Sequence, residues 1–288
     1  MGLRDAGTKK VTLIEQKIQE EEVDEDPIDF DNIEVDINAE DKITFFIYGA
    51  KNDGKTVCGY SLMDKGDTAL VISIDNQSHH ALREVPYLRD KIESGDIAVT
   101  VVNGTRYYDK SSQAIMLRTA QKTLDYILGV LNEYKTGNKT INGKRPDWVI
   151  IDGTERLNGI CEMVMRKNNG VRAYDGISNF NLWKERNQYI DDIHTKSFNL
   201  CTKGVIYTSY TTIKEIINNS TVVKSKELPK WVGQIMEETN VQIFVEADRE
   251  GIKPIYYAKI SGSKRQSLYP DGLYDITNRT LKESINES

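Results

Sequence analysis

Short apolar segments alternate with amphipathic segments along most of the chain. The apolar segments are rich in Val, Ile and aromatic residues and end at turn-forming residues, which is typical of buried strands. The predicted strands are residues 43–48, 69–75, 97–102, 148–152, 205–209, 241–246 and 255–260. The last two are joined across residues 248–251 and predict an antiparallel hairpin.

Helical periodicity fills the intervals between these strands. It is clearest at residues 112–134, where apolar side chains recur near one face: Ile115, Leu124, Ile127, Leu128 and Leu131. A second helical pattern covers residues 181–200. Strands that alternate with helices predict an α/β fold, in which helices flank a mostly parallel central sheet.

Charge divides the chain into two unequal parts. The whole sequence carries a formal net charge of −6. Residues 15–41 hold 13 carboxylates against one cation, a net of −12, which leaves +6 for the remainder. We therefore expect an acidic N-terminal extension at residues 1–40 and one folded domain at residues 41–288. Because that domain is basic, the overall pI of about 5.3 does not exclude a nucleic-acid partner.

The remaining composition is that of an ordinary globular chain. Its apolar runs, such as residues 148–151, are far shorter than the roughly 20 residues that cross a bilayer, and the N-terminus lacks the apolar stretch of a signal peptide. Cys58, Cys161 and Cys201 are odd in number and widely spaced, which favours a reducing compartment. We expect a cytoplasmic protein that does not enter a membrane.

The most specific motif is Gly49-Ala50-Lys51-Asn52-Asp53-Gly54-Lys55-Thr56, a full match to the phosphate-binding loop (P-loop) pattern G-x-x-x-x-G-K-[ST]. A predicted strand precedes it and a helix can follow from Thr56, so backbone N–H groups would converge on one polyphosphate. Lys55 would reach the β- and γ-phosphates, and the Thr56 hydroxyl would ligate Mg²⁺. Val57 completes the predicted nucleotide site. The alternative is a glycine-containing turn that matches by chance.

A P-loop also needs a carboxylate on a neighbouring strand to hold the metal ion. Asp152 ends the apolar strand at residues 148–152 and is the first candidate, while Asp75 is a weaker one of the same kind. An ordinary strand that ends in Asp before a turn remains the alternative.

The order of these segments resembles the RecA-like ATPase core. The resemblance covers residues 41–265 and is carried by the P-loop, Ile74-Asp75, Ile150-Ile151-Asp152 and Ile206-Tyr207-Thr208-Ser209, of which only the P-loop is highly specific. The chain is most similar to small AAA-type ATPases of phages and archaeal viruses, some of which act as single-strand annealing or recombinase-like proteins.

Several residue roles follow from this resemblance. It implies that Asp152 is the Walker B aspartate and that Thr208 or Ser209 senses the γ-phosphate. It also implies a homo-oligomer, either a ring or a filament, in which ATP lies between subunits. Lys264 and Arg265 resemble the basic finger that a neighbouring subunit supplies, although they could equally form a solvated turn.

One position departs from the family pattern. Where recombinases carry a catalytic glutamate beyond the second strand, this chain has Gln77, which can orient water but cannot accept its proton as a carboxylate does. Hydrolysis is then slow, or another carboxylate takes over. Glu155 is the nearest candidate, with a helix N-terminal acid as the alternative interpretation.

Two long polar segments are candidate loops for single-stranded DNA, because they combine cations with aromatic residues. The first carries Arg166, Lys167 and Arg172 near Tyr174, and the second, residues 210–231, carries Lys214, Lys224 and Lys226. The first hypothesis is therefore an ATPase acting on single-stranded DNA in recombination or replication. A nucleotide-gated switch or assembly ATPase that binds a protein through the acidic extension is the second, and a packaging motor the third. The preference for ATP over GTP rests on the resemblance alone.

Overall fold

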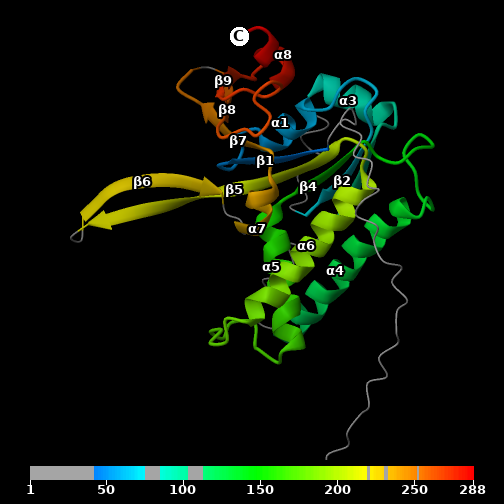
Figure 1. Cartoon of the computed structure of the whole chain (residues 1–288), viewed down its shortest axis with the longest axis vertical. Coiled ribbons are helices and arrows are strands. Elements are labelled where there is room, and N and C mark those ends of the chain that lie inside the picture. The colour runs from blue at the N-terminus through cyan, green and yellow to red at the C-terminus, as the bar shows by residue number, and fades with distance from the viewer. Residues whose placement is uncertain (1–41, 75–84, 103–112, 219–220, 230–232, 252) are drawn as a thin grey trace, which may run out of the picture. The chain divides into compact units, whose positions relative to one another are not determined.

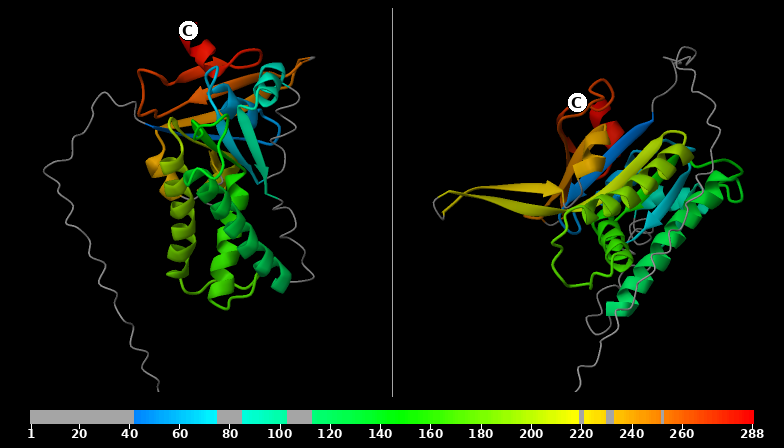
Figure 2. Two further views of the ribbon diagram at one scale, coloured as in Figure 1. Left: turned by 90° about the vertical axis from the view of Figure 1, so that its right-hand side faces the viewer. Right: turned by 60° about the horizontal axis from the view of Figure 1, so that its bottom comes forward.

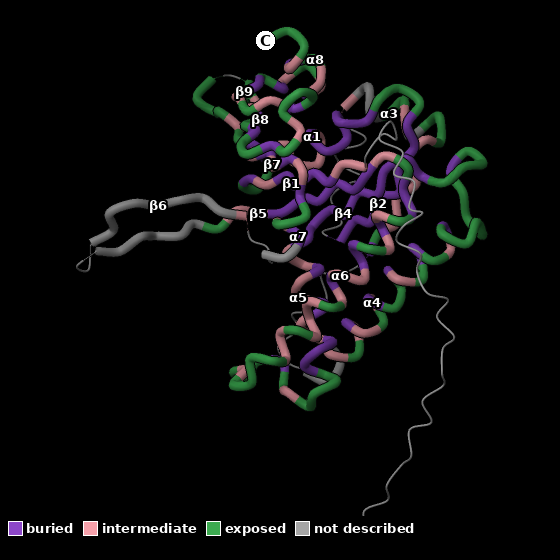
Figure 3. The backbone as a smooth tube through the Cα atoms, viewed as in Figure 1, coloured by how far each residue is buried: buried purple, intermediate pink, exposed green. Residues whose placement is uncertain are grey.

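Strands whose residues are all buried form the centre of the domain. In β2 (Ala69–Ser73) and β4 (Trp148–Asp152) every residue is buried, and β1 (Ile43–Gly49) is buried over most of its length. Continuous apolar runs of this kind belong to strands covered on both faces. The computed structural model describes residues 42–74, 85–102, 113–218, 221–229, 233–251 and 253–288. In Figure 3 the buried residues concentrate in this sheet.

The sheet has the strand order β3-β2-β4-β5-β1-β7-β8-β9. Its further strands are β3 (Ile97–Val101), β5 (Gly204–Asn218), β7 (Val241–Asp248), β8 (Ile255–Ile260) and β9 (Gly272–Asp275). Pairing is parallel from β3 to β7 and antiparallel from β7 to β9. β5 lies between β1, which leads into the P-loop, and β4, which ends at Asp152. This arrangement is a RecA-like P-loop NTPase fold, so the predicted fold class and the C-terminal hairpin are confirmed (Figure 1).

Alternate residues of each central strand enter two different hydrophobic cores, because successive side chains point to opposite faces of a sheet. Phe46 and Ile72 belong to one core and Phe45 and Val71 to the other. The first core is covered by three neighbouring helices, α4 (Gln113–Lys135), α5 (Thr154–Asn168) and α6 (Leu182–Leu200), which lie side by side in Figures 1 and 2. The second is covered by α1 (Lys55–Ser61) and α8 (Leu281–Asn286). The shorter α3 (Pro86–Glu93) and α7 (Gly233–Glu238) complete the described helices.

Two segments predicted as loops are regular structure instead. β5 continues to Asn218 and pairs with the antiparallel β6 (Thr221–Pro229), so the prediction of a polar loop at residues 210–231 is wrong. The two strands form a ribbon that projects beyond the sheet (Figures 1 and 2). Thr and Ile residues favour this extension of β5. In the first segment, α5 runs to Asn168, so Arg166 and Lys167 occupy its last turn rather than a loop.

The predicted N-terminal extension lies outside the described residues, and its boundary near residue 40 stays a prediction. From Lys42 onward the described residues belong to one compact unit. Among the helices of the described ranges, none combines the length and the hydropathy that crossing a bilayer requires.

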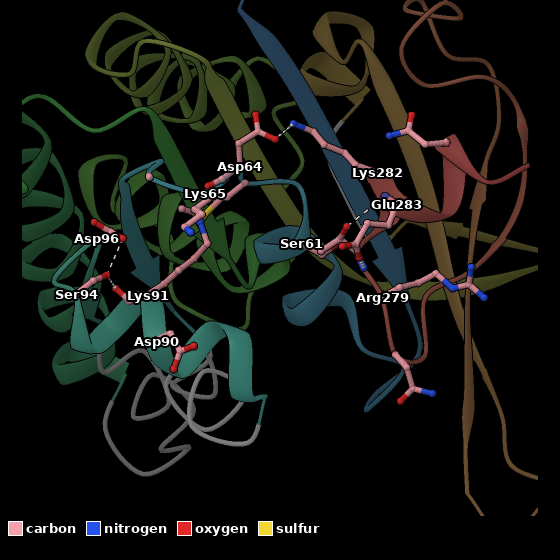
Figure 4. Close-up of a pocket in the computed structure, with 15 residues that line it drawn as sticks. Ser61, Asp64, Lys65, Asp90, Lys91, Ser94, Asp96, Arg279, Lys282 and Glu283 are labelled. Atoms are coloured by element: carbon pink, nitrogen blue, oxygen red, sulfur yellow. Dashed lines mark hydrogen bonds and ion pairs between the residues drawn. The ribbon is translucent and has the colours of Figure 1, made fainter.

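The C-terminal helix α8 is attached beside a polar cleft of about 750 Å³ (Figure 4). Thr280 and Glu283 form a capping box, in which each side chain accepts a hydrogen bond from the other residue's backbone N–H. Lys282 Nζ lies 2.7 Å from Asp64 Oδ1 across the cleft. The cleft borders the N-terminal ends of β2 and β3 and is therefore at the sheet edge opposite the P-loop.

We predict that Leu281→Ala weakens the attachment of α8. Leu281 is fully buried in the second core, and removing such a side chain costs about 2–4 kcal/mol of unfolding free energy. Urea unfolding followed by circular dichroism measures the change. Leu268→Ala is the control, because Leu268 is 58% exposed and its loss should change stability by no more than about 0.5 kcal/mol. Equal unfolding midpoints for both variants would contradict the packing described here.

Candidate nucleotide-binding site

The P-loop follows directly from the end of β1 and is held against β7. A Cβ added to Gly49 would lie only 2.2 Å from the carbonyl oxygen of Val245, so glycine is required there. Gly54 adopts a φ of 87°, in the left-handed region that glycine reaches without strain. α1 then starts at Lys55, with its first N–H groups next to the loop. The local structure is therefore the strand–loop–helix unit that the motif predicts.

The Lys55 side chain folds back over the loop. Its Nζ donates a hydrogen bond to the carbonyl oxygen of Ala50 at 2.6 Å and lies 4.3 Å from the ring centroid of Tyr210. Both contacts stabilise an ammonium group, one by a charge-assisted hydrogen bond and the other by a cation–π interaction. Lys55 is thus held at the mouth of the loop by neutral groups that phosphate oxygens could replace.

Asp152 meets two hydroxyl groups from other elements. Thr56 Oγ1 lies 3.3 Å from each of its carboxylate oxygens, and Thr208 Oγ1 donates a hydrogen bond to Asp152 Oδ1. The backbone N–H of Gly153 in turn donates to Thr208 Oγ1 at 3.1 Å. Hydroxyl and carboxylate oxygens are the donors that Mg²⁺ takes from proteins, so this set fits the ion that the P-loop implies. The predicted metal residues therefore lie together.

The two predicted sensor residues differ in their contacts. Thr208 is paired with Asp152 in the β4–β5 register and bonds to its side chain. Ser209 is equally buried, but its hydroxyl donates to the carbonyl oxygen of Tyr210 at 3.3 Å. Thr208 thus links the sensor strand to the metal-ligand candidate.

Glu155, the candidate base, lies in the first turn of α5, just beyond Asp152. Both of its carboxyl oxygens are buried and lack a hydrogen-bond partner among the described residues. Burial raises the pKa of this carboxyl, an effect that the nearby backbone N–H groups of Glu155 and Tyr210 offset only in part. A buried carboxyl with a raised pKa next to a P-loop fits a general base. Gln77 lies outside the described residues, as does Asp75.

Lys264 and Arg265 are not part of the P-loop site of their own chain. They follow β8, whose end pairs near the start of β7, so they lie at the sheet edge opposite the P-loop. The Lys264 Nζ donates to the carbonyl oxygen of Glu237 at 2.7 Å. A role for these residues in a neighbouring subunit stays a prediction.

Among the predicted DNA-binding residues, Arg166 has an internal structural role. Its side chain is buried, lies 2.8 Å from Glu162 as an ion pair, and donates to the carbonyl oxygens of Arg172 and Asp175. It therefore fixes the connection between α5 and α6 through contacts inside the protein, and its role in DNA binding stays a prediction. Lys167 and Arg172 are exposed, and Lys214, Lys224 and Lys226 lie on the β5–β6 ribbon.

Sequence reasoning missed the contribution of the β7–β8 turn to this site. Arg249 Nη2 lies 2.8 Å from Asp53 Oδ1 and donates to the carbonyl oxygen of Asn52 at 3.0 Å. The ring of Tyr256 on β8 packs against Gly54, where an added Cβ would meet it at 3.2 Å. No motif links these residues to the P-loop, because the contacts arise only when β7 pairs with β1.

Comparison with known proteins adds little to this geometry. No protein-family model matches the chain, and no curated protein is significantly similar to it. Among solved structures, it is similar to the KaiC-like protein PH0186 from Pyrococcus horikoshii, with 14% identity and a TM-score of 0.39. It is also similar to the flagellar accessory protein FlaH from Methanocaldococcus jannaschii, with 13% identity and a TM-score of 0.41. Each alignment covers 81% of this chain and 84% of the other. The fold assignment rests on the strand order and the P-loop.

We predict that Glu155→Gln lowers nucleotide hydrolysis by about a hundredfold or more while ATP binding persists, because a general base contributes about that much. In the wild-type protein the rate should fall on acidification at a higher pH than an ordinary glutamate would cause, because the base must be ionised and its pKa is raised. Phosphate release measured across pH tests both points.

Glu133→Gln is the matched control for this substitution, because Glu133 is a half-exposed carboxylate on α4 that pairs with Lys139. Its phosphate release should equal that of the wild-type protein. Undiminished release from Glu155→Gln would remove Glu155 from the chemistry.

Proposed function

We propose that this protein binds ATP with Mg²⁺ at the P-loop, hydrolyses it, and acts on single-stranded DNA in recombination or replication of the phage or viral type. The observation that carries the nucleotide site is the convergence of Thr56, Asp152 and Thr208 beside the P-loop. These residues come from α1, β4 and β5, and a chance match to the P-loop motif would not bring them together.

Each residue of the site then has a defined task in hydrolysis. Lys55 leaves the Ala50 carbonyl oxygen and neutralises charge on the β- and γ-phosphates. Thr56 and Asp152 would hold Mg²⁺, which neutralises phosphate charge when bound. Glu155 accepts the proton of the attacking water, and Thr208 keeps Asp152 oriented through its hydrogen bond.

The DNA-binding part of the proposal is supported by the register of the β5–β6 ribbon. Lys214 is paired with Lys226, and Ile216 with Lys224. Residues that are paired, or two positions apart along a strand, share a face, so the three lysines lie on one face of the ribbon. Glu215 is paired with Ser225 and Ile213 with Glu227, so the two carboxylates belong to the other face.

This distribution of charge suits a polyanionic ligand. Like charges directly opposite each other on two strands destabilise the pairing, and a bound phosphate backbone would offset that repulsion. The ribbon also continues β5 beyond Thr208, so the proposed DNA surface and the nucleotide sensor lie on one strand.

The assembly and location of the protein belong to the same proposal. We infer a homo-oligomer, ring or filament, in the cytoplasm of the cell, which is the host cell if the protein is viral. Lys264 and Arg265 of one subunit would then face the nucleotide of its neighbour. The basic finger would complete the site only after assembly.

A second function, a nucleotide-gated assembly ATPase with a protein partner, is favoured by the 13 carboxylates of residues 15–41. A block of like charge stays solvated unless a partner neutralises it. Deleting residues 1–40 separates the two functions. Partner binding requires the extension, whereas DNA binding should stay unchanged or become tighter without it.

We predict that Lys55→Ala abolishes ATP binding, because the P-loop lysine supplies the charge that meets the phosphates. Isothermal titration with Mg²⁺-ATP measures the affinity. Lys65→Ala is the control, since Lys65 is an exposed lysine at the opposite sheet edge. Wild-type affinity in Lys55→Ala would refute the nucleotide-site assignment.

We predict that replacing Lys214, Lys224 and Lys226 together by alanine weakens binding of single-stranded DNA in the presence of ATP. The slope of log affinity against log salt should fall by about 0.7 for each lysine that contacts a phosphate. Fluorescence anisotropy with a labelled oligonucleotide measures both quantities.

The matched control for the ribbon variant replaces three exposed lysines outside the ribbon, Lys135, Lys253 and Lys259. That control should bind the oligonucleotide as the wild-type protein does. If the wild-type protein does not bind the oligonucleotide at low salt with ATP, the DNA-binding part of the proposal is wrong.

A further inference from the structure

The P-loop contains a carboxylate at the place where it is to receive a polyphosphate. Asp53 is 5% exposed, and its Oδ2 accepts a hydrogen bond from the backbone N–H of Ala50 at 3.0 Å. Asp53 therefore helps to shape the loop. The same carboxylate places a negative charge in the loop that is to bind the phosphates, and it would repel their oxygens unless a cation compensates it.

The structure supplies that cation from the β7–β8 turn. Arg249 Nη2 lies 2.8 Å from Asp53 Oδ1 and also donates to the carbonyl oxygen of Asn52 at 3.0 Å. Arg249 thus contacts a side chain and a backbone carbonyl of the loop at once. A charge-assisted contact with two acceptors fixes both charge and position.

The backbone around Arg249 is itself anchored to the loop. β7 pairs with β1 so that Val245 lies opposite Gly49, and the ring of Tyr256 packs on Gly54. The turn that carries Arg249 is therefore attached on both sides to residues that contact the P-loop. This attachment holds the guanidinium beside Asp53 before any nucleotide arrives.

We infer that Arg249 is a positioning residue of the nucleotide site, which neutralises Asp53 and so allows the P-loop to accept the polyphosphate of ATP. The inference rests on the proposed function, because it concerns the same site. It differs from the basic finger expected at Lys264 and Arg265, because Arg249 belongs to the same chain as the P-loop that it serves and acts through Asp53 rather than on the nucleotide.

The test compares four full-length variants by isothermal titration with Mg²⁺-ATP: Arg249→Ala, Arg249→Lys, Asp53→Asn and the double variant Asp53→Asn/Arg249→Ala. We expect Arg249→Ala to weaken ATP binding by about tenfold or more, because it leaves a buried carboxylate unpaired beside the phosphates. Arg249→Lys should restore part of the loss, since it keeps the charge. The double variant should bind ATP like Asp53→Asn, because without the carboxylate no charge remains to be neutralised.

Two controls separate this role from a purely structural one. Arg279→Ala removes an exposed arginine that pairs with Glu287 far from the P-loop, and it should bind ATP as the wild-type protein does. Thermal unfolding without nucleotide shows whether each variant is folded. A structural role would lower the affinity of Arg249→Ala and of the double variant alike.

The outcomes also distinguish this inference from the proposed function. If the wild-type protein does not bind ATP, the proposed function fails. If the wild-type protein binds ATP and Arg249→Ala binds equally well, or the double variant binds as weakly as Arg249→Ala, the proposed function stands and the role of Arg249 is overturned.

Discussion

Parallel pairing of β5 with both β1 and β4 brings Asp152, Thr208 and the P-loop together. The register pairs Asp152 with Thr208 and Gly49 with Tyr210, so the ends of three strands meet at one sheet edge. Hydrogen bonds to both neighbouring strands fix this alignment from Gly204 to Thr208. A shift of β5 by one residue would turn Thr208 to the other face and separate it from Asp152.

The polar groups at this end of the sheet can be buried because they form hydrogen bonds with one another. Asp152, Thr154 and Thr208 are all buried, and Thr154 Oγ1 donates to the carbonyl oxygen of Thr208 at 2.8 Å. A buried polar group costs stability mainly when it has no partner. Glu155 is the exception, since its carboxyl oxygens are buried and have no hydrogen-bond partner in the described part of the chain. Such an unsatisfied group fits a residue kept for chemistry rather than for stability.

Local sequence patterns predicted the core strands and the P-loop because those features depend on neighbouring residues. Residues 148–152 form one apolar run that ends in a carboxylate, and the structure has a strand at Trp148–Asp152. The extension of β5 was missed because Lys214 and Glu215 interrupt its apolar pattern, and its partner β6 is recognisable only by pairing. The contact of Arg249 with Asp53 joins residues that are 196 positions apart, so no local pattern could indicate it.

Among the described residues, β5 has two neighbouring strands along its first part and one along its second part. From Gly204 to Thr208 it is held between β1 and β4, whereas beyond Tyr210 its pairing within the described part of the chain is with β6 alone. The inner part is thus fixed on both sides and the outer part on one. The ribbon therefore leaves the sheet at Tyr210, whose ring contacts Lys55 of the P-loop. Because β5 is one strand from Gly204 to Asn218, the ribbon and the tyrosine that contacts Lys55 share a single backbone.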